Sequence, residues 1–219
     1  MRSISSFLEQ TLLTPSVTQE DIDRLVRESL EYQFFGICVP PFWVKKARRE
    51  IGKAPITLIT VAGFPMGYSR TEVKLEEIKR ALEDGADEVD MVWNISAFKS
   101  KHPWVKIEIA QCAKACHAHC KILKVIIETS YLSNEEIVEA CKICTDAGAD
   151  FVKTSTGYGG EGAKAEHIKL MRSTLPESVG IKASGGIKTF QQALELIEAG
   201  ASRIGTSNGT KILSSANQL

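Results

Sequence analysis

This sequence of 219 residues has no excess of charge, because Lys plus Arg and Asp plus Glu both number 27. A balanced charge gives no electrostatic reason to expect nucleic acid or an anionic membrane as a partner. No apolar run is long enough to span a bilayer, and the first 20 residues contain no apolar stretch of signal-peptide length. These absences predict a cytoplasmic protein whose six cysteines stay reduced and free.

The sequence also lacks a linker, because no low-complexity segment and no stretch rich in Pro, Gly or Ser divides it. We therefore expect residues 1–219 to form a single domain. With 43% hydrophobic residues, a chain of this length can bury a core that needs no disulfide or metal to hold it.

A short motif recurs where a helix is expected to end and a strand to begin. It reads EDGADEVDMV at 83–92, TDAGADFVKT at 145–154 and EAGASRIGTS at 198–207. The glycine of each copy (Gly85, Gly148 or Gly200) suits the left-handed position that ends a helix, and a β-rich apolar run follows at once. Repetition of one αβ junction is typical of a fold built from βα units.

Eight short apolar runs are candidate strands, and helical patterns separate them throughout. They lie near residues 8–13, 36–40, 56–63, 88–93, 121–128, 151–155, 180–184 and 203–206. Ser133 with Glu136, and Thr189 with Gln192, have the spacing of capping boxes at helix starts. Eight consecutive βα units predict an α/β fold, a single (β/α)8 TIM barrel; an open, doubly wound sheet is the alternative.

The apolar runs of four candidate strands are each interrupted by one charged residue, although strands of a parallel barrel should be nearly continuous apolar runs. The four are Asp90 in EVDMVW, Lys124 in ILKVII, Lys153 in FVKTST and Lys182 in GIKASGG. A charge that faced the outer helices would lie in a dry, apolar contact, so pointing into the barrel costs less free energy. We therefore expect the four side chains to converge on one small cavity.

Three lysines and one carboxylate in one cavity suit the chemistry of imine formation. An ordinary lysine has a pKa of about 10.4, but burial and a neighbouring ammonium lower that pKa and allow a neutral amine to attack a carbonyl. Lys153 and Lys182 both precede small polar or Gly-rich strand ends, where the active sites of barrels lie. Lys124 is either catalytic support or the partner that keeps Asp90 ionised. In the alternative interpretation, these lysines extend to solvent at strand ends and pair there with carboxylates.

Three strand ends run into small, Gly-rich loops that indicate a phosphate site. The loops are STGYGGEG at 155–162, ASGGI at 183–187 and IGTSNGT at 204–210. Glycines let the backbone approach an anion, and the last two loops follow strands seven and eight, the usual phosphate position in barrels. Ser207, Asn208 and a helix start near Thr210 add further donors. The alternative is that these glycines only form tight turns.

The segment CAKACHAHC, residues 112–120, invites a metal interpretation. Cys112, Cys116 and Cys120 are four residues apart, so on a helix they would share one face, which favours core packing over zinc binding. We expect no metal site and no cofactor.

The motifs KTSTGYGGEGA (153–163), KASGGI (182–187) and RIGTSNG (203–209) stand in the same order as GFPMG (63–67), EVDMVWN (88–94) and LKVIIET (123–129) before them. Together they resemble the deoxyribose-phosphate aldolases, a family of class I, Schiff-base aldolases, over nearly the whole chain. The resemblance implies reversible cleavage of 2-deoxy-D-ribose 5-phosphate to D-glyceraldehyde 3-phosphate and acetaldehyde. This reaction needs no metal and belongs to deoxyribose phosphate catabolism.

The resemblance also implies roles for individual residues. In this family, the lysine matching Lys153 forms the imine, the one matching Lys182 tunes it and relays protons, and the aspartate matching Asp90 donates and accepts protons. Lys124 and Thr156 would support them. The 5-phosphate would be held by Gly157, Gly185, Gly186, Gly205, Ser207 and Asn208. The implied partners are the sugar phosphate and acetaldehyde, and family precedent suggests a homodimer.

The sequence departs from the family pattern at the first strand and after Gly157. The usual Asp-His-Thr-Leu-Leu is Glu-Gln-Thr-Leu-Leu at residues 9–13, so we expect a different polar network there. Tyr158 stands where some members have a lysine, and Asn208 replaces a common serine but still offers an N–H donor. Two other functions stay open: a Schiff-base aldolase for another phosphorylated sugar, and a non-catalytic barrel that binds sugar phosphates.

Overall fold

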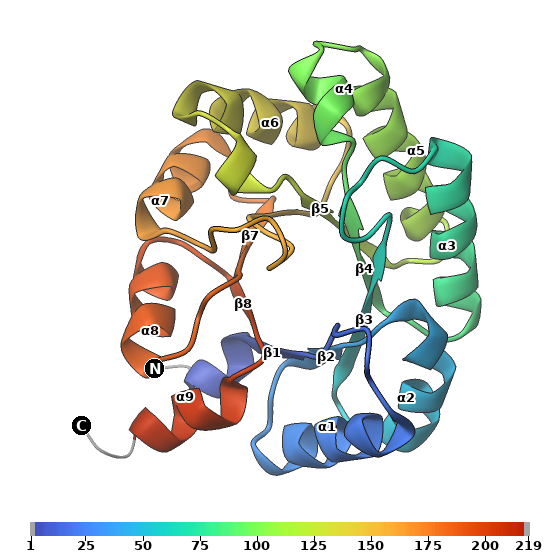
Figure 1. Cartoon of the computed structure of the whole chain (residues 1–219), viewed down its shortest axis with the longest axis vertical. Coiled ribbons are helices and arrows are strands. Elements are labelled where there is room, and N and C mark those ends of the chain that lie inside the picture. Colours follow the sequence, from blue (N-terminus) through green and yellow to red (C-terminus); the bar gives the residue numbers. More distant parts are fainter. Residues whose placement is uncertain (1–2, 217–219) are drawn as a thin grey trace.

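The computed structural model describes residues 3–216, in which eight parallel strands close into a barrel in sequence order. The strands are β1 (Leu8–Thr11), β2 (Gly36–Cys38), β3 (Thr57–Ala62), β4 (Glu88–Val92), β5 (Ile122–Ile126), β6 (Phe151–Lys153), β7 (Gly180–Ser184) and β8 (Arg203–Thr206). Strand β8 pairs with β1 and completes the ring, which Figure 1 shows from one end. The predicted closed barrel is therefore confirmed, and the open sheet is excluded.

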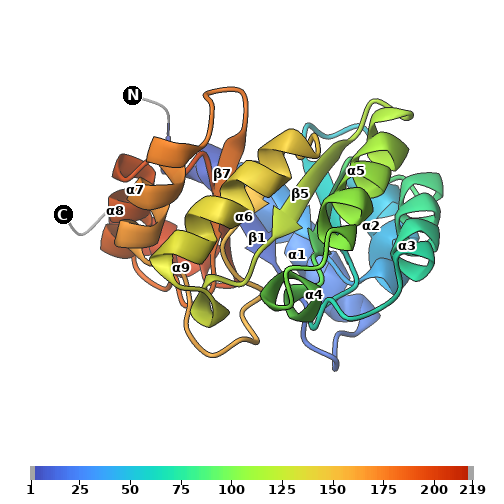
Figure 2. The same cartoon turned by 90° about the horizontal axis from the view of Figure 1, so that it is seen from above.

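Helices form the outer layer around the strands (Figures 1 and 2). They are α1 (Gln19–Glu31), α2 (Val44–Ile51), α3 (Thr71–Glu83), α4 (Ile95–Lys99), α5 (Trp104–His117), α6 (Asn134–Asp146), α7 (Ala165–Thr174), α8 (Phe190–Glu198) and α9 (Gly209–Ala216), with short 3-10 turns η1 (Ile4–Phe7), η2 (Pro41–Trp43) and η3 (Thr129–Tyr131). Within residues 3–216, none of the helices combines the length and apolarity that a membrane span requires.

Local sequence signals begin and end these helices as predicted. Ser133 and Thr189 are the N-caps of α6 and α8, and each forms a capping box with the residue three positions on. The three repeated glycines follow α3, α6 and α8 with positive φ angles, 101° at Gly85, 82° at Gly148 and 115° at Gly200. A side chain at these positions would be strained, so the glycines end the helices and turn the chain into the next strand.

Apolar side chains fill the space between the strands and the outer helices. Val89 and Met91 of β4 belong to this core, whereas Asp90 between them points to the other face of the strand, into the barrel. A smaller apolar cluster of Cys38, Ile59 and Val61 forms on β2 and β3. The barrel interior is therefore apolar beside β2 and β3 and charged beside the other strands that carry the site.

The cysteine-rich segment belongs mainly to helix α5. Cys112 and Cys116 are buried in the core, as expected for one helical face. Cys120 is exposed and lies beyond His117, the last residue of the helix. The expectation that it shares the buried face is wrong because the helix ends before reaching it. Among residues 3–216, no group of three or more His, Cys, Asp or Glu side chains is arranged to hold a metal ion.

Candidate active site

The four charged strand residues meet inside the barrel around the carboxylate of Asp90. Its Oδ1 accepts a hydrogen bond from Nζ of Lys124 at 2.8 Å. Its Oδ2 accepts from Nζ of Lys153 at 2.8 Å and from Nζ of Lys182 at 2.6 Å. Strand register explains the meeting, because Asp90 pairs with Lys124 across β4 and β5, and Lys153 with Lys182 across β6 and β7. All four side chains are buried.

Two further carboxylates, which the sequence analysis did not name as site residues, complete this charged cluster. Glu9 of β1 is fully buried, bonds to Nζ of Lys182, and lies 3.8 Å from Nε of Arg203. Glu88 of β4 contacts Nζ of Lys124. Glu9 is a single charge within the candidate strand of residues 8–13, which is the same signal that identified the other four residues and could have identified this one.

The charges in the cluster balance if Lys153 is neutral. Three carboxylates are present, Glu9, Glu88 and Asp90. The cations other than Lys153 also number three, Lys124, Lys182 and Arg203. A protonated Lys153 would therefore add one uncompensated charge to a buried site, which is costly in free energy.

The surroundings of the lysines favour the same protonation state. Burial lowers the pKa of Lys153, and the ammonium of Lys182 adds to this effect against the opposing charge of Asp90. Burial acts in the same direction at Lys182, but Asp90 and Glu9 outweigh it and raise the pKa of Lys182. Burial would raise the pKa of Asp90, but Lys124, Lys153 and Lys182 hold that pKa well below its usual range. The cluster thus combines an amine whose pKa is lowered, an ammonium whose pKa is raised and a carboxylate whose pKa is lowered.

Lys153 also reaches a cavity of about 250 Å³ at the mouth of the barrel. Gly205 of β8 contributes to its lining. Loops after β1, β6, β7 and β8 contribute Leu13, Thr156, Gly157, Tyr158, Gly185, Gly186, Lys188, Ser207 and Asn208. Lys124 and Lys182 are not among the lining residues. These loops follow the carboxyl ends of the strands, where active sites of barrels lie. The geometry therefore places one amine of the cluster within reach of a ligand.

The six residues that we expect to bind the phosphate all line this cavity. Some of the glycines are also required by the backbone conformation or by the packing at their positions. Gly157 and Gly185 each have a φ of 90°, which other residues rarely adopt. At Gly205, a Cβ would lie 2.9 Å from Cε of Lys182, so this glycine makes room for the lysine. Lys188, which the sequence analysis did not name, adds an exposed ammonium to the lining.

The hydrogen-bond donors at the start of helix α9 differ from those that we expected from the sequence. The backbone N–H of Asn208 donates to Oγ1 of Thr206 at 2.9 Å, so it is not the free donor that the sequence analysis expected. The side-chain amide of Asn208 remains, 3.3 Å from Oγ of Ser207. The N–H of Gly209 donates to Oε1 of Gln10 at 2.8 Å. Gln10, which departs from the family pattern, therefore anchors the first residue of α9 to strand β1.

The chain matches the DeoC/LacD family of aldolases over residues 5–215. It belongs to this family. A deoxyribose-phosphate aldolase of Thermococcus kodakarensis is 51% identical and aligns over 98% of this chain and 97% of its own length. One of Caldicellulosiruptor saccharolyticus is 48% identical over 97% of this chain and 98% of its own. The solved structure of a tetrameric deoxyribose phosphate aldolase from Aeropyrum pernix has a TM-score of 0.92 and 34% identity, over 98% of this chain and 91% of that one.

Tyr158 connects two other loops at the mouth of the barrel. Its hydroxyl donates to the carbonyl oxygen of Leu13 at 3.0 Å, and its ring meets Phe64 edge-on, with 5.6 Å between the centroids. The side chain therefore joins the loops after β1, β3 and β6 at the mouth of the barrel. It contributes an aromatic surface there and no charge.

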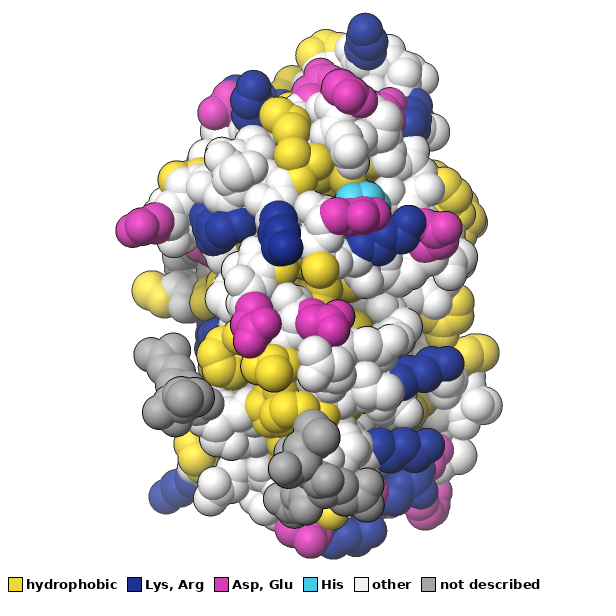
Figure 3. Space-filling model, turned by 90° about the vertical axis from the view of Figure 1, so that its left-hand side faces the viewer, with side chains coloured by type: hydrophobic (Ala, Val, Ile, Leu, Met, Phe, Trp, Pro, Cys, Tyr) yellow, Lys and Arg dark blue, Asp and Glu magenta, His cyan; other side chains and the backbone are white. Residues whose placement is uncertain are grey.

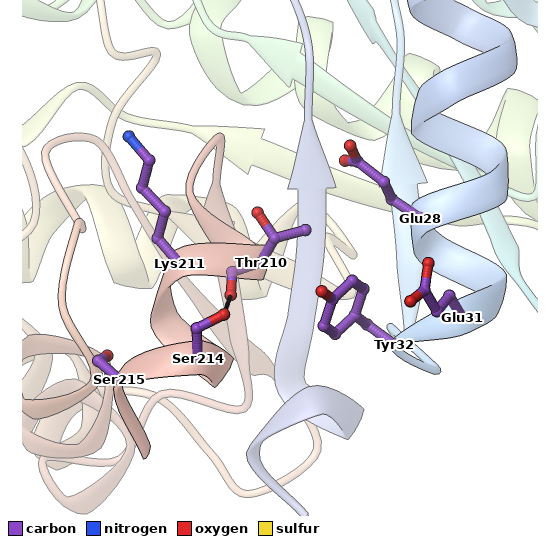
Figure 4. Close-up of a pocket in the computed structure, with 7 residues that line it drawn as sticks. All are labelled: Glu28, Glu31, Tyr32, Thr210, Lys211, Ser214 and Ser215. Carbon is purple, nitrogen blue, oxygen red and sulfur yellow. Dashed lines mark hydrogen bonds between the residues drawn. The ribbon is translucent and has the colours of Figure 1, made fainter. Parts of the chain in front are cut away.

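A larger hollow of about 570 Å³ lies in the outer layer of this aldolase, between α1 and α9 (Figure 4). Its lining consists of Glu28, Glu31, Tyr32, Thr210, Lys211, Ser214 and Ser215. None of these residues belongs to the charged cluster, and several of them are open to solvent. Basic and acidic side chains also intermingle on the face that Figure 3 shows. The barrel mouth, which holds the buried amine, is therefore the candidate active site.

Proposed function

We propose that this aldolase cleaves 2-deoxy-D-ribose 5-phosphate reversibly into D-glyceraldehyde 3-phosphate and acetaldehyde. One observation carries the proposal: Lys153, a buried amine whose pKa is lowered, lines a cavity bounded by the Gly-rich loops after β6, β7 and β8. Relatives that align over nearly their full length and carry the name deoxyribose-phosphate aldolase support the choice of substrate.

The reaction begins when the neutral amine of Lys153 attacks the aldehyde carbon, C1, of the sugar phosphate. Loss of water from the carbinolamine leaves an iminium between C1 and Nζ. The departing hydroxyl needs a proton, and Lys182 is an ammonium beside Lys153 because its pKa is raised by Asp90 and Glu9 against the effect of burial. Lys182 and Asp90 therefore supply and take back protons, directly or through a water.

Cleavage follows at the bond between C2 and C3. The bonding electron pair moves towards the iminium and leaves an enamine, while the C3 hydroxyl loses its proton and becomes the aldehyde of glyceraldehyde 3-phosphate. Protonation of the enamine at C2 and hydrolysis of the imine release acetaldehyde and restore Lys153. Asp90 is ionised between the lysines at the start of these steps, accepts the proton of the C3 hydroxyl and gives a proton back when C2 is protonated. Lys124 holds Asp90 in that state from the opposite oxygen.

The phosphate would bind at the outer part of the cavity. Backbone N–H groups of Gly157, Gly185, Gly186 and Gly205, the hydroxyl and N–H of Ser207 and the amide of Asn208 would serve as donors. The ammonium of Lys188 adds positive charge. In the sequence, Thr156 lies between Lys153 and Gly157, and it also lines the cavity. We assign it a supporting role in substrate binding.

Acetaldehyde with borohydride tests the proposal most directly. Reduction of the imine should leave a stable two-carbon label, which peptide mapping should find on Lys153. A label at another residue, or none, contradicts the proposal. Labelling by dihydroxyacetone phosphate in place of acetaldehyde would indicate an aldolase for another sugar. Thermal stabilisation by sugar phosphates without turnover would indicate a non-catalytic binder.

We further infer that residues 1–219 act as one catalytic domain, in the cytoplasm and as a homodimer. All six cysteines are free, which suits a reducing compartment. The Aeropyrum pernix relative is tetrameric, so assemblies of more than one copy occur among similar proteins. Sedimentation equilibrium would distinguish a dimer from a monomer or a tetramer.

A further inference from the structure

Glu128 follows strand β5 and combines burial with an unusual backbone conformation. Its φ of 53° and ψ of 75° lie in the left-handed region, which residues other than glycine rarely occupy. Its side chain is only 2% exposed, and it belongs neither to the charged cluster nor to the lining of the mouth cavity. Such a conformation persists where the surrounding contacts outweigh its cost.

Those contacts are made with the loop after β6, residues 155–162. Oε2 of Glu128 accepts hydrogen bonds from the backbone N–H of Thr156 at 2.9 Å and from its hydroxyl at 2.5 Å. The hydroxyl of Ser130 donates to the carbonyl oxygen of Gly159 at 3.0 Å. A Cβ on Gly159 would lie 2.5 Å from the carboxylate carbon of Glu128, so the loop packs directly on this side chain.

These bonds orient the hydroxyl of Thr156. Its proton goes to Glu128, and its oxygen accepts a hydrogen bond from the N–H of Tyr158 at 3.0 Å. Thr156, Gly157 and Tyr158 all line the mouth cavity together with Lys153. The conformation of this part of the cavity therefore depends on a carboxylate that lies behind it.

We propose that Glu128 is a positioning residue, which acts through Thr156 to hold the loop of residues 155–162 in its substrate-binding conformation. The proposal builds on the function proposed above. Hydrogen bonds to a buried carboxylate are stronger than neutral ones, and a Gly-rich loop has little rigidity of its own. The amine of Lys153 is held separately by Asp90. Glu128 should therefore affect the binding of the phosphorylated substrate and leave the reactivity of the amine unchanged.

Three variants at this position separate these effects. Glu128→Gln keeps an oxygen that can accept both bonds from Thr156. Glu128→Asn tolerates a positive φ but is one methylene too short to reach both donors. Glu128→Ala removes the bonds entirely. We expect KM for 2-deoxyribose 5-phosphate to rise by about tenfold or more in the Ala and Asn variants and by less than about threefold in the Gln variant.

The rate of acetaldehyde labelling at Lys153 serves as the second measurement. It should stay within about twofold of the wild type in all three variants, because acetaldehyde has no phosphate to bind. The tenfold rise expected in KM corresponds to about 1.4 kcal/mol. An unchanged KM in the Ala and Asn variants overturns the proposal. So does a parallel loss of labelling and turnover, which would indicate general damage to the fold. If Glu128→Ala does not fold, the Asn and Gln pair gives the same comparison. The proposed function fails independently if the wild-type protein is not labelled.

Discussion

Replacing Lys182 with methionine should move the pH dependence of imine formation at Lys153 to higher pH. In the structure, both nitrogens lie against Oδ2 of Asp90, at 2.6 Å for Lys182 and 2.8 Å for Lys153. Burial and then the ammonium of Lys182 lower the pKa of Lys153, and the reactive form is the neutral amine. Without that ammonium the pKa of Lys153 rises, so the same neutral fraction is reached only at higher pH.

The size of the effect follows from the closeness of the two nitrogens. Two unit charges about 4 Å apart interact by about 4 kcal/mol at an effective dielectric constant of about 20. The ionised Asp90 between them offsets part of this interaction. If about a third remains, roughly 1.4 kcal/mol, the neutral fraction changes by about tenfold. We therefore expect the rate of acetaldehyde labelling near neutral pH to fall by about tenfold or more and to recover at alkaline pH.

The assay is the initial rate of borohydride trapping, measured against pH for the wild type and for Lys182→Met and Lys182→Arg. Arginine keeps the positive charge but does not release a proton. Its profile should therefore stay at the wild-type position even if proton transfer is slower. A Lys182→Met profile with the wild-type midpoint would refute the electrostatic role assigned to Lys182.

Stability needs its own control, because Lys182→Met leaves the carboxylate of Glu9 buried without its ammonium. Removing one partner of a buried ion pair typically costs about 3–5 kcal/mol. The double variant Glu9→Gln/Lys182→Met removes both charges and should unfold at a higher temperature than the single variant. Its labelling profile should be shifted in the same direction, which separates the loss of charge from the loss of stability.

Three other outcomes are expected. Lys153→Arg removes the nucleophile and places a permanent positive charge at its position, so labelling and turnover should vanish, and an active variant would rule out the imine. Gly205→Ala places a Cβ 2.9 Å from Cε of Lys182. The pH profile of labelling should therefore shift to higher pH, as in Lys182→Met but by a smaller amount. An unshifted profile would contradict this prediction. Lys74 and Glu108 form a buried pair at 2.8 Å, so Lys74→Met should lower the free energy of unfolding in urea by about 3–5 kcal/mol. Adding Glu108→Leu should restore most of that loss, and no recovery would contradict the argument.

Much of the architecture could be predicted because its signals are local. A glycine that ends a helix, a capping box that starts one and an apolar run between them each act within a few residues, and their repetition indicates the barrel. The charged cluster could be predicted in part for the same reason. A single charge in an apolar strand, as at Lys153 or Lys182, is expected to face the barrel interior, because the contact with the outer helices is dry and apolar.

Only the tertiary structure decided which lysine has the lowered pKa and which the raised one. That depends on Glu9, whose carboxylate comes from β1 to neutralise Lys182 of β7, and on the cavity that Lys153 reaches while Lys182 does not. The same holds for Glu128, whose hydrogen bonds to Thr156 join segments 28 residues apart. Protonation and loop position are set by distances across the closed barrel. The spacing of residues in the sequence does not determine those distances, because they are fixed only when the strands pair in the folded barrel.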